Sequence, residues 1–227
     1  RRNPIYAVPN MVFGSMANDG GNLILSTEEK KDLLREYPDS ETYIRPFLGS
    51  REFINRIERY CLWISSEQAK DAIRIHPIKK RMEKVREIRL ASKRKSTQEL
   101  ANVPYSFGEV RQPKTDYLLV PRVSSENRKY IPIGYVSSEV IASDAVLIIL
   151  EARAYQFAIM SSNVHNAWMR VVAGRLKSDY RYSSSIVYNN FPWPKLNDTE
   201  RSKLTNTANM ILKAREINPE WSYADLI

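Results

Sequence analysis

The sequence has few of the residues that build disulfide frameworks and zinc sites. Its 227 residues include one cysteine, Cys61, and two histidines, His76 and His165. One cysteine excludes an intrachain disulfide framework, and these three residues do not have the spacing of a zinc site. We expect Cys61 to be a small core residue, because it lies in an apolar run, residues 59–65, that is typical of a buried strand. His165 is expected to be a packed or capping imidazole.

Glycine is also scarce, and its placement argues against several classes of enzyme. None of the seven glycines has the spacing of a phosphate-binding or dinucleotide-binding loop. The sequence contains no Gly-x-Ser-x-Gly nucleophile elbow, and its acids do not form the short Pro-Asp…Glu-x-Lys arrangement of many metal-dependent nucleases. We therefore expect no catalytic residue, bound cofactor or metal site in this chain, and its class as an enzyme stays open.

Long apolar runs are absent too. No run approaches the ~20 residues that a membrane-spanning helix needs, so we expect no membrane contact. The chain begins at Arg1, and no signal-peptide pattern is expected at its start. We expect a piece of a longer, soluble protein in the reducing cytoplasm.

Positive charge is abundant and concentrated. The net charge is +9, and residues 70–100 alone hold eleven Lys and Arg against four Asp and Glu. Apolar residues recur there at helical spacing, at Ile78, Met82, Val85 and Ile88. This pattern predicts an amphipathic helix whose remaining faces are basic, with Lys80 and Lys84 among the exposed cations. Such a helix is either an ordinary solvated surface or one that contacts phosphates.

The overall pattern predicts an α+β fold, mainly an antiparallel sheet with packed helices, followed by a helical C-terminal segment. Short β-type runs at residues 117–123, 130–135 and 140–150 suggest an antiparallel meander. Ser26 is the expected N-cap of a short helix that ends near Tyr37.

Two further helices are expected towards the C-terminus. The first covers residues 152–173, with Trp168, Val171 and Val172 facing the core and Gly174 as a left-handed stop. The second covers residues 199–216. Between them, residues 191–194 (FPWP) are interpreted as a structural plug that ends the domain.

The segment from Arg175 to Ser183 combines charged and aromatic residues in a way that suits DNA. If it is one extended strand, Arg175, Lys177, Asp179 and Arg181 lie on one face, and Tyr180 lies on the other. Lys177 and Asp179 would then be ~7 Å apart, and could bind the guanine acceptors and the cytosine donor of one G·C pair in the major groove. The alternative is a surface strand whose opposite charges simply pair, worth at most about 1 kcal/mol.

A polar loop between two expected strands offers additional contacts. Residues 124–129 (SSENRK) combine hydroxyl, amide and basic groups, a mixture common at phosphate contacts. The candidates are Arg122, Ser124, Ser125 and Arg128. An ordinary polar hairpin is an equally good interpretation.

Eight ordered motifs resemble one protein family. They are residues 10–16 (NMVFGSM), 18–23 (NDGGNL), 43–47 (YIRPF), 59–63 (RYCLW), 121–126 (PRVSSE), 130–134 (YIPIG), 174–183 (GRLKSDYRYS) and 188–194 (YNNFPWP). The family is the MmeI-like single-chain restriction–modification enzymes, type IIL, with their adenine-specific DNA methyltransferase relatives. One departure is residues 55–58 (NRIE), which stand where relatives tend to have a Gly-containing turn.

The resemblance implies an organisation and a function. Residues 1–22 would be a linker from an N-terminal methyltransferase domain, residues 23–194 a DNA target-recognition domain, and residues 195–227 the start of a helical C-terminal module. The implied partners are double-stranded DNA and the methyltransferase domain of the same parent chain. S-adenosylmethionine, and Mg²⁺ for any cleavage, would belong to the parent enzyme. In the family, the pair matching Lys177 and Asp179 reads one base pair, and Lys/Asp implies guanine.

Two other functions stay open at this point. The chain could be a basic protein–protein docking module, similar to a specificity subunit, without direct base readout. An enzyme with an unrecognised site is the third, weakest alternative. Neither the recognition sequence, nor DNA cleavage by the parent, nor DNA binding by this chain alone follows from the sequence, and the oligomeric state is equally open.

Overall fold

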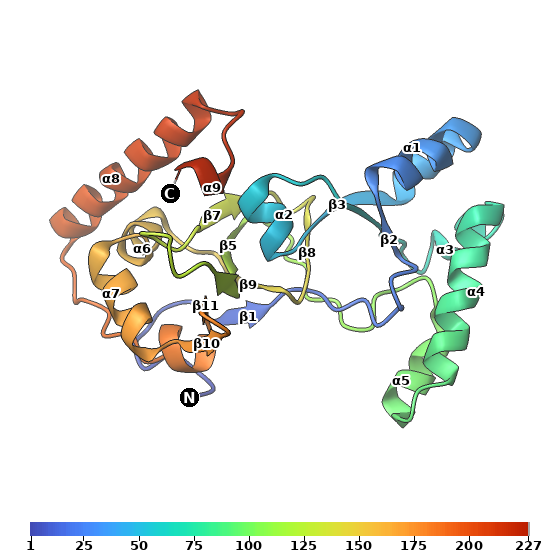
Figure 1. Cartoon of the computed structure of the whole chain (residues 1–227), viewed down its shortest axis with the longest axis horizontal. Helices are drawn as coiled ribbons and strands as arrows, with labels where there is room; N and C mark the ends of the chain where they lie inside the picture. Colours follow the sequence, from blue (N-terminus) through green and yellow to red (C-terminus); the bar gives the residue numbers. More distant parts are fainter. Residues whose placement is uncertain (227) are drawn as a thin grey trace.

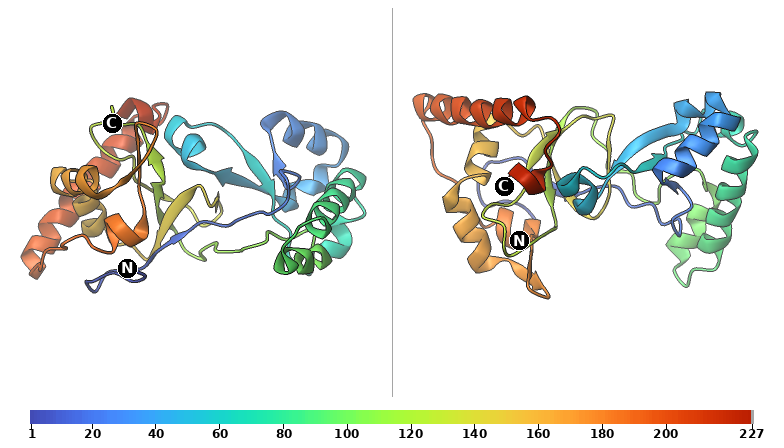
Figure 2. Two further views of the ribbon diagram at one scale, coloured as in Figure 1. Left: turned by 60° about the horizontal axis from the view of Figure 1, so that its bottom comes forward. Right: turned by 45° about the horizontal axis from the view of Figure 1, so that its top comes forward.

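The structure, a computed structural model, describes residues 1–226. Figure 1 shows an elongated molecule with a lobe at each end. We call residues 18–48 together with 59–107 the basic lobe, and residues 1–13 together with 117–226 the hairpin lobe. Both chain termini lie in the hairpin lobe, as all three ribbon views show (Figures 1 and 2).

The basic lobe is built on a four-stranded sheet. Its order is β2 (Ile24–Leu25), β4 (Tyr60–Leu62), β3 (Ile44–Leu48) and β8 (Ile141–Ala142). The helices around it are α1 (Thr27–Glu36), η1 (Pro38–Tyr43), α3 (Ala69–Ala72), α4 (His76–Leu90), α5 (Lys95–Glu99) and η2 (Leu100–Asn102). Strand β8 comes from a later segment and pairs in parallel with β3, whereas the other pairs are antiparallel. This late strand ties the two lobes together.

The local predictions for the early part of this lobe are confirmed. Helix α1 begins at Ser26, whose hydroxyl accepts from the Glu29 N–H while the Glu29 carboxylate accepts from the Ser26 N–H, a reciprocal capping box. Cys61 is fully buried in β4. Burial raises the pKa of its thiol well above the usual range, which suits an unreactive core residue.

Helix α4 has the predicted apolar face, with one exchange at its end. Ile78, Met82 and Val85 are buried as expected, but Ile88 is 44% exposed and its neighbour Arg89 is fully buried. The Arg89 guanidinium replaces the fourth apolar contact because it donates five hydrogen bonds to backbone carbonyls. Adjacent residues are about 100° apart around a helix, so Arg89 takes the buried position in place of Ile88 without any break in the helix.

The hairpin lobe contains a second four-stranded sheet, fully antiparallel. Its order is β1 (Met11–Phe13), β9 (Val146–Leu150), β5 (Tyr117–Pro121) and β7 (Gly134–Val136). The antiparallel strands were expected, but they do not form a meander, because β5 lies between β7 and β9. Residues 11–13, placed in the expected linker, form the edge strand β1. The domain boundaries at residues 22 and 194 stay predictions.

Helix α2 (Ser50–Asn55) lies between the lobes and ends in a left-handed turn at Arg56. Arg56 has φ +51°, a conformation that glycine adopts most easily. This is the turn for which relatives were expected to have glycine. Helix α2 contributes Phe53 and Ile54 to a small core shared with Tyr117 and Ile148 of the hairpin lobe.

The helix expected over residues 152–173 is two helices. They are α6 (Ala154–Met160) and α7 (Asn163–Val172), and the break lies at Ser161 and Ser162. Ser162 ends the first helix by donating to the Ile159 carbonyl, and caps the second by accepting from the His165 N–H. Val171 is 84% exposed instead of buried. Gly174 starts a strand and is not a left-handed stop.

The C-terminal helical segment is confirmed. Helix α8 (Asp198–Ile217) begins with a capping box between Asn197 and Glu200 and packs on α6, with Ala208 buried at the contact. The short helices η3 (Ser184–Tyr188) and α9 (Tyr223–Leu226) flank it in sequence. Phe191 and Trp193 are buried, as expected of a plug. Within residues 1–226 no helix has the length and apolar character to span a bilayer.

Candidate nucleic-acid interface

The segment expected to be one strand is a β-hairpin. Strands β10 (Gly174–Leu176) and β11 (Asp179–Arg181) pair antiparallel, with Leu176 opposite Asp179 and a two-residue loop between them. The chain reverses at Lys177, which has φ +55°. The predicted alternation of four charged residues on one strand face is therefore wrong. The reversal nevertheless keeps Lys177 and Asp179 together, because it places both at the tip.

The hairpin is anchored by its aromatic residues. Tyr180 and Tyr182 are buried, and the Tyr182 hydroxyl is 2.9 Å from Nε2 of His165. The Arg175 guanidinium stacks on the outer side of Tyr180, 3.9 Å from the ring centroid. Tyr180 thus supports the hairpin from inside, and its ring is not free to reach DNA. His165 is the packed imidazole that the sequence predicted.

Strand β6 (Val123–Ser124) extends the hairpin into a three-stranded sheet. Tyr180 pairs with Ser124, and Arg181 pairs with Val123. Ser124 is buried, and its hydroxyl has no hydrogen-bond partner among the described residues. Ser125 and Arg128, in the loop that follows, are half-buried. The sheet therefore brings most of the predicted candidates to one place, with Ser124 as a supporting residue.

A cleft beside this sheet is lined by four arginines. Arg181 belongs to β11, and Arg122 directly precedes β6. Arg51 belongs to α2, and Arg59 to the segment after it. We call this hollow the arginine cleft; its volume is about 620 Å³, and Leu176 of the hairpin also borders it. Four guanidinium groups around one hollow favour a polyanionic partner.

The cleft arginines are held in different ways. Arg122 donates to the Asp144 carbonyl and stacks on Phe13, 4.8 Å from the ring centroid. Arg59 forms an ion pair with Glu52, whose side chain is only 10% exposed. Arg181 is exposed on the hairpin. Sequence reasoning missed Arg51 and Arg59, because more than 60 residues separate them from Arg122.

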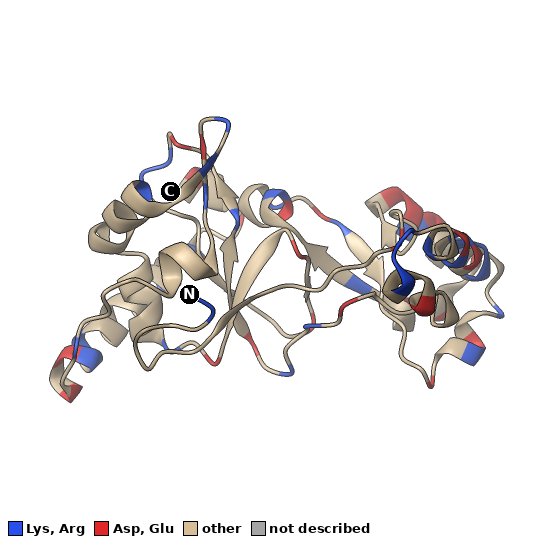
Figure 3. Cartoon of the chain, turned by 90° about the horizontal axis from the view of Figure 1, so that it is seen from below, with Lys and Arg blue, Asp and Glu red and all other residues tan. Residues whose placement is uncertain are grey.

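The basic helix α4 contributes less charge to the surface than its composition suggests. Arg89 is buried, and Arg81 donates to the Asn22 and Ile24 carbonyls and pairs with Glu29. Figure 3 shows acidic residues interleaved with basic ones on the helices of this lobe. Lys80 and Lys84 are exposed, in the other lobe from the hairpin. They remain candidates for phosphate contacts only.

Comparisons with known proteins identify the family. Residues 1–195 match the family described as the MmeI target recognition domain. DNA methyltransferase A of Bacillus subtilis (strain 168) is 39% identical over 217 residues, which are 95% of this chain and 25% of that protein.

A solved structure of the type IIL restriction–modification enzyme MmeI in complex with DNA is also similar. It has a TM-score of 0.94 and 43% identity, and covers 99% of this chain but 30% of that protein. The chain thus spans about a quarter to a third of the relatives it matches. The resemblance first indicated by the eight motifs is confirmed: this chain belongs to the MmeI target recognition domain family.

Proposed function

We propose that this chain recognises a specific sequence in double-stranded DNA, as the non-catalytic reading module of a site-specific adenine-N6 methyltransferase or restriction–modification enzyme. The observation that carries the proposal is the hairpin β10–β11, which has Lys177 and Asp179 at its tip and borders the arginine cleft through Leu176 and Arg181. A two-stranded ribbon fits the major groove of B-DNA, where each base pair presents its own pattern of donors and acceptors. Membership of the target recognition domain family supports this reading.

Lys177 and Asp179 are proposed to read one G·C pair. The Lys177 ammonium donates to O6 and N7 of guanine, and the Asp179 carboxylate accepts from the cytosine N4 amine. Their location at the hairpin tip lets both side chains reach adjacent edges of the groove without moving the anchored tyrosines. The two residues thus supply one donor and one acceptor, as a single base pair requires.

The surrounding cations are proposed to hold the duplex in register. Arg122, Arg175, Arg181 and Arg128 lie near the hairpin, whereas Lys80 and Lys84 lie on α4 in the other lobe. Contacts to phosphates add affinity that is independent of sequence and sensitive to salt. In this proposal the surrounding cations position the duplex, and Lys177 and Asp179 read the base pair.

The methyl-transfer chemistry is assigned to the rest of the parent protein. S-adenosylmethionine would supply the methyl group, and Mg²⁺ would assist any cleavage. This chain has no Gly-rich loop for the cofactor, and its described residues bring together no three His, Cys, Asp or Glu that could hold a metal. The methyltransferase domain is therefore the proposed intramolecular partner, in the cytoplasm.

The test is a selection from a randomised duplex pool at several salt concentrations, followed by sequencing. We expect an enriched motif containing a G·C pair, and its loss in the double variant Lys177→Glu/Asp179→Arg. The matched control is Lys31→Glu/Asp32→Arg, which makes the same charge exchanges on exposed positions of α1. Salt-dependent binding without enrichment would reduce the chain to a general DNA clamp. No binding at low salt would instead favour the protein–protein docking module.

A further inference from the structure

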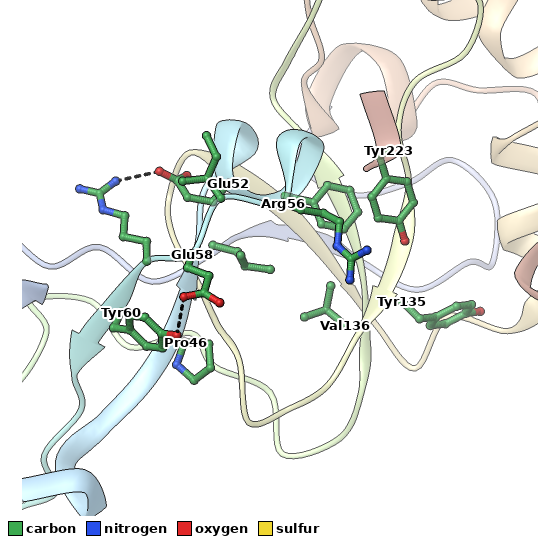
Figure 4. Close-up of a pocket in the computed structure, with 12 residues that line it drawn as sticks. Pro46, Glu52, Arg56, Glu58, Tyr60, Tyr135, Val136 and Tyr223 are labelled. Atoms are coloured by element: carbon green, nitrogen blue, oxygen red, sulfur yellow. Dashed lines mark hydrogen bonds and ion pairs between the residues drawn. The ribbon is translucent and has the colours of Figure 1, made fainter. Parts of the chain in front are cut away.

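The C-terminal helix α9 contacts α2, the helix between the lobes, through one aromatic pair. Tyr223 of α9 stacks on Phe53 of α2, with ring centroids 4.4 Å apart and an interplanar angle of 26°. Figure 4 shows Tyr223 descending from α9 beside α2. A hollow of about 450 Å³ opens next to this pair, and both Phe53 and Tyr223 line it.

The chain makes room for Tyr223 at Gly134. A Cβ atom at this position would lie 2.0 Å from the Tyr223 hydroxyl oxygen and 3.1 Å from the Phe53 ring. The φ angle of Gly134 lies outside the left-handed region, so space alone accounts for glycine here. Gly134 ends the motif YIPIG, to which the proposed function assigns no role. The site therefore accepts Tyr223 only while residue 134 lacks a side chain.

Arg215 holds the C-terminal segment in this position. Its guanidinium donates to the Ile133 carbonyl at 2.7 Å and lies 4.8 Å from the centroid of the Tyr223 ring. Helix α8, which carries Arg215, packs along α6. Arg215 and α8 thus fix the position of Tyr223 relative to the core of the hairpin lobe.

The first residue of α2, Ser50, is hydrogen-bonded to the wall of the arginine cleft. The Ser50 hydroxyl donates to the Ala145 carbonyl at 2.6 Å and accepts from the Arg122 N–H at 3.2 Å. Both partners line the cleft. Ser50 and Phe53 are three residues apart, less than one turn of the helix, so a shift of one residue moves the other.

We propose that Tyr223 is a positioning residue for sequence recognition. It acts through Phe53 and α2 on Ser50, and so fixes the Arg122 backbone and the shape of the arginine cleft, without touching DNA. This inference rests on the proposed function for its effect on DNA. The mechanical link itself is independent of DNA and can be tested without it.

The first test is hydrogen exchange of the Arg122 amide in the DNA-free chain. We expect this amide to exchange about 2- to 30-fold faster in Tyr223→Ala, the range typical of mutations that alter coupling between sites. Tyr223→Phe keeps the stacked ring and should retain wild-type protection. Gly134→Ala should reproduce the effect by displacing the ring, and should add nothing in the Tyr223→Ala background.

Two controls separate positioning from loss of stability. Trp221→Ala changes an exposed aromatic side chain of the same segment, and Leu33→Ala destabilises the basic lobe far from α2. Neither should change Arg122 exchange under native conditions. Equal acceleration in Leu33→Ala, or unchanged exchange in Tyr223→Ala, would overturn the proposed link.

The second test measures discrimination between the enriched duplex and the same duplex with one base pair replaced. We expect Tyr223→Ala to lower this ratio about 2- to 30-fold, with the salt dependence of binding unchanged. Unchanged discrimination despite faster Arg122 exchange would overturn the role in recognition. If the wild-type chain enriches no sequence, the proposed function fails, and the exchange experiment still decides the mechanical link.

Discussion

At the scale of single residues, the buried Arg89 shows how one charged side chain organises a lobe. Its guanidinium binds the carbonyls of five residues from two loops: Ala17, Asn18, Leu100, Val103 and Ser106. The carbonyls of Ala17, Leu100 and Val103 also accept from backbone N–H groups. Arg89 is the only donor to the carbonyls of Asn18 and Ser106 among the described residues. Arg89 therefore connects both loops to helix α4 and to each other.

Replacing Arg89 with methionine should destabilise the chain strongly. The aliphatic volume is kept, but five backbone carbonyls lose a hydrogen bond from a charged donor, and those of Asn18 and Ser106 lose their only donor among the described residues. We therefore expect a loss of about 3–5 kcal/mol in the free energy of unfolding. Urea denaturation measures this loss. Arg86→Met, at an exposed position of the same helix, is the matched control and should stay within about 0.5 kcal/mol of wild type. A loss below about 1 kcal/mol for Arg89→Met would contradict the proposed contribution of the Arg89 hydrogen bonds to stability.

His165 should make the hairpin lobe sensitive to acid. Burial lowers the pKa of His165 from its usual 6.5 to about 4, because Nδ1 has no partner among the described residues to stabilise the charged ring. In the unfolded chain the imidazole takes up its proton near pH 6.5. The stability contributed by the neutral ring is thus complete above pH 6.5 and is lost as the pH falls towards 4, by about 3 kcal/mol in total.

Urea denaturation between pH 7.5 and 5 checks this prediction before most carboxylates titrate. We expect the slope of stability against pH to flatten in His165→Phe and to persist in His76→Asn, which alters the exposed histidine. A direct pKa of His165 from NMR gives a second measurement if His165→Phe does not fold. An NMR pKa near 6.5 would contradict the prediction.

At the scale of elements, the backbone conformation that residue 177 needs in the hairpin can be tested separately from the hydrogen-bond donor on its side chain. A non-glycine residue with φ +55° is strained by about 1 kcal/mol, which glycine avoids. Lys177→Gly should therefore keep the hairpin and leave the free energy of unfolding within about 1 kcal/mol of wild type. It should still weaken discrimination at the G·C pair by about 1–3 kcal/mol, because the donor is lost.

Paired unfolding and competition-binding measurements test this separation. Ser178→Gly, in the same loop, is the control and should leave discrimination unchanged. If Lys177→Gly discriminates as well as wild type, Lys177 does not read the base pair.

Elements also show where pattern reasoning succeeds and where it stops. The start of α1 at Ser26 and the extent of α8 follow from local capping and spacing, so they could be predicted. The break at Ser161 and Ser162 depends on a serine that acts as a cap in the interior of an apolar helical pattern. The reversal at Lys177 has no glycine, asparagine or proline to signal it, so the segment was expected to be one strand.

At the scale of the whole molecule, folding redistributes the positive charge. The excess in residues 70–100 is partly consumed inside the basic lobe by Arg81 and Arg89, whereas the arginine cleft collects cations from three separate segments. Contacts to DNA should therefore fall into two groups. We expect the exposed lysines on α4 to act on any sequence, and the hairpin tip to act on one base pair.

Single substitutions should distinguish these two groups. Lys84→Ala removes one proposed phosphate contact, so it should weaken binding to all duplexes alike and lower the slope of log K against log salt by about one. Asp179→Ala should instead lower discrimination at one base pair by about 1–3 kcal/mol with little change in slope. Titrations at three or more salt concentrations measure both quantities. Equal weakening by both variants on every duplex would contradict this division.

The sequence alone determined the fold class, the helices with local caps, the family and the candidate pair Lys177 and Asp179, because each depends on residues within a few positions of one another. Only the tertiary structure decided that Arg89 is buried, that Arg51 and Arg59 join Arg122 in a cleft, and that Tyr223 reaches Phe53. These arrangements include contacts between residues far apart in the sequence, such as Arg89 with Ala17 and Tyr223 with Phe53. Local spacing carries no information about such contacts, because they arise when the two lobes and the C-terminal segment pack together.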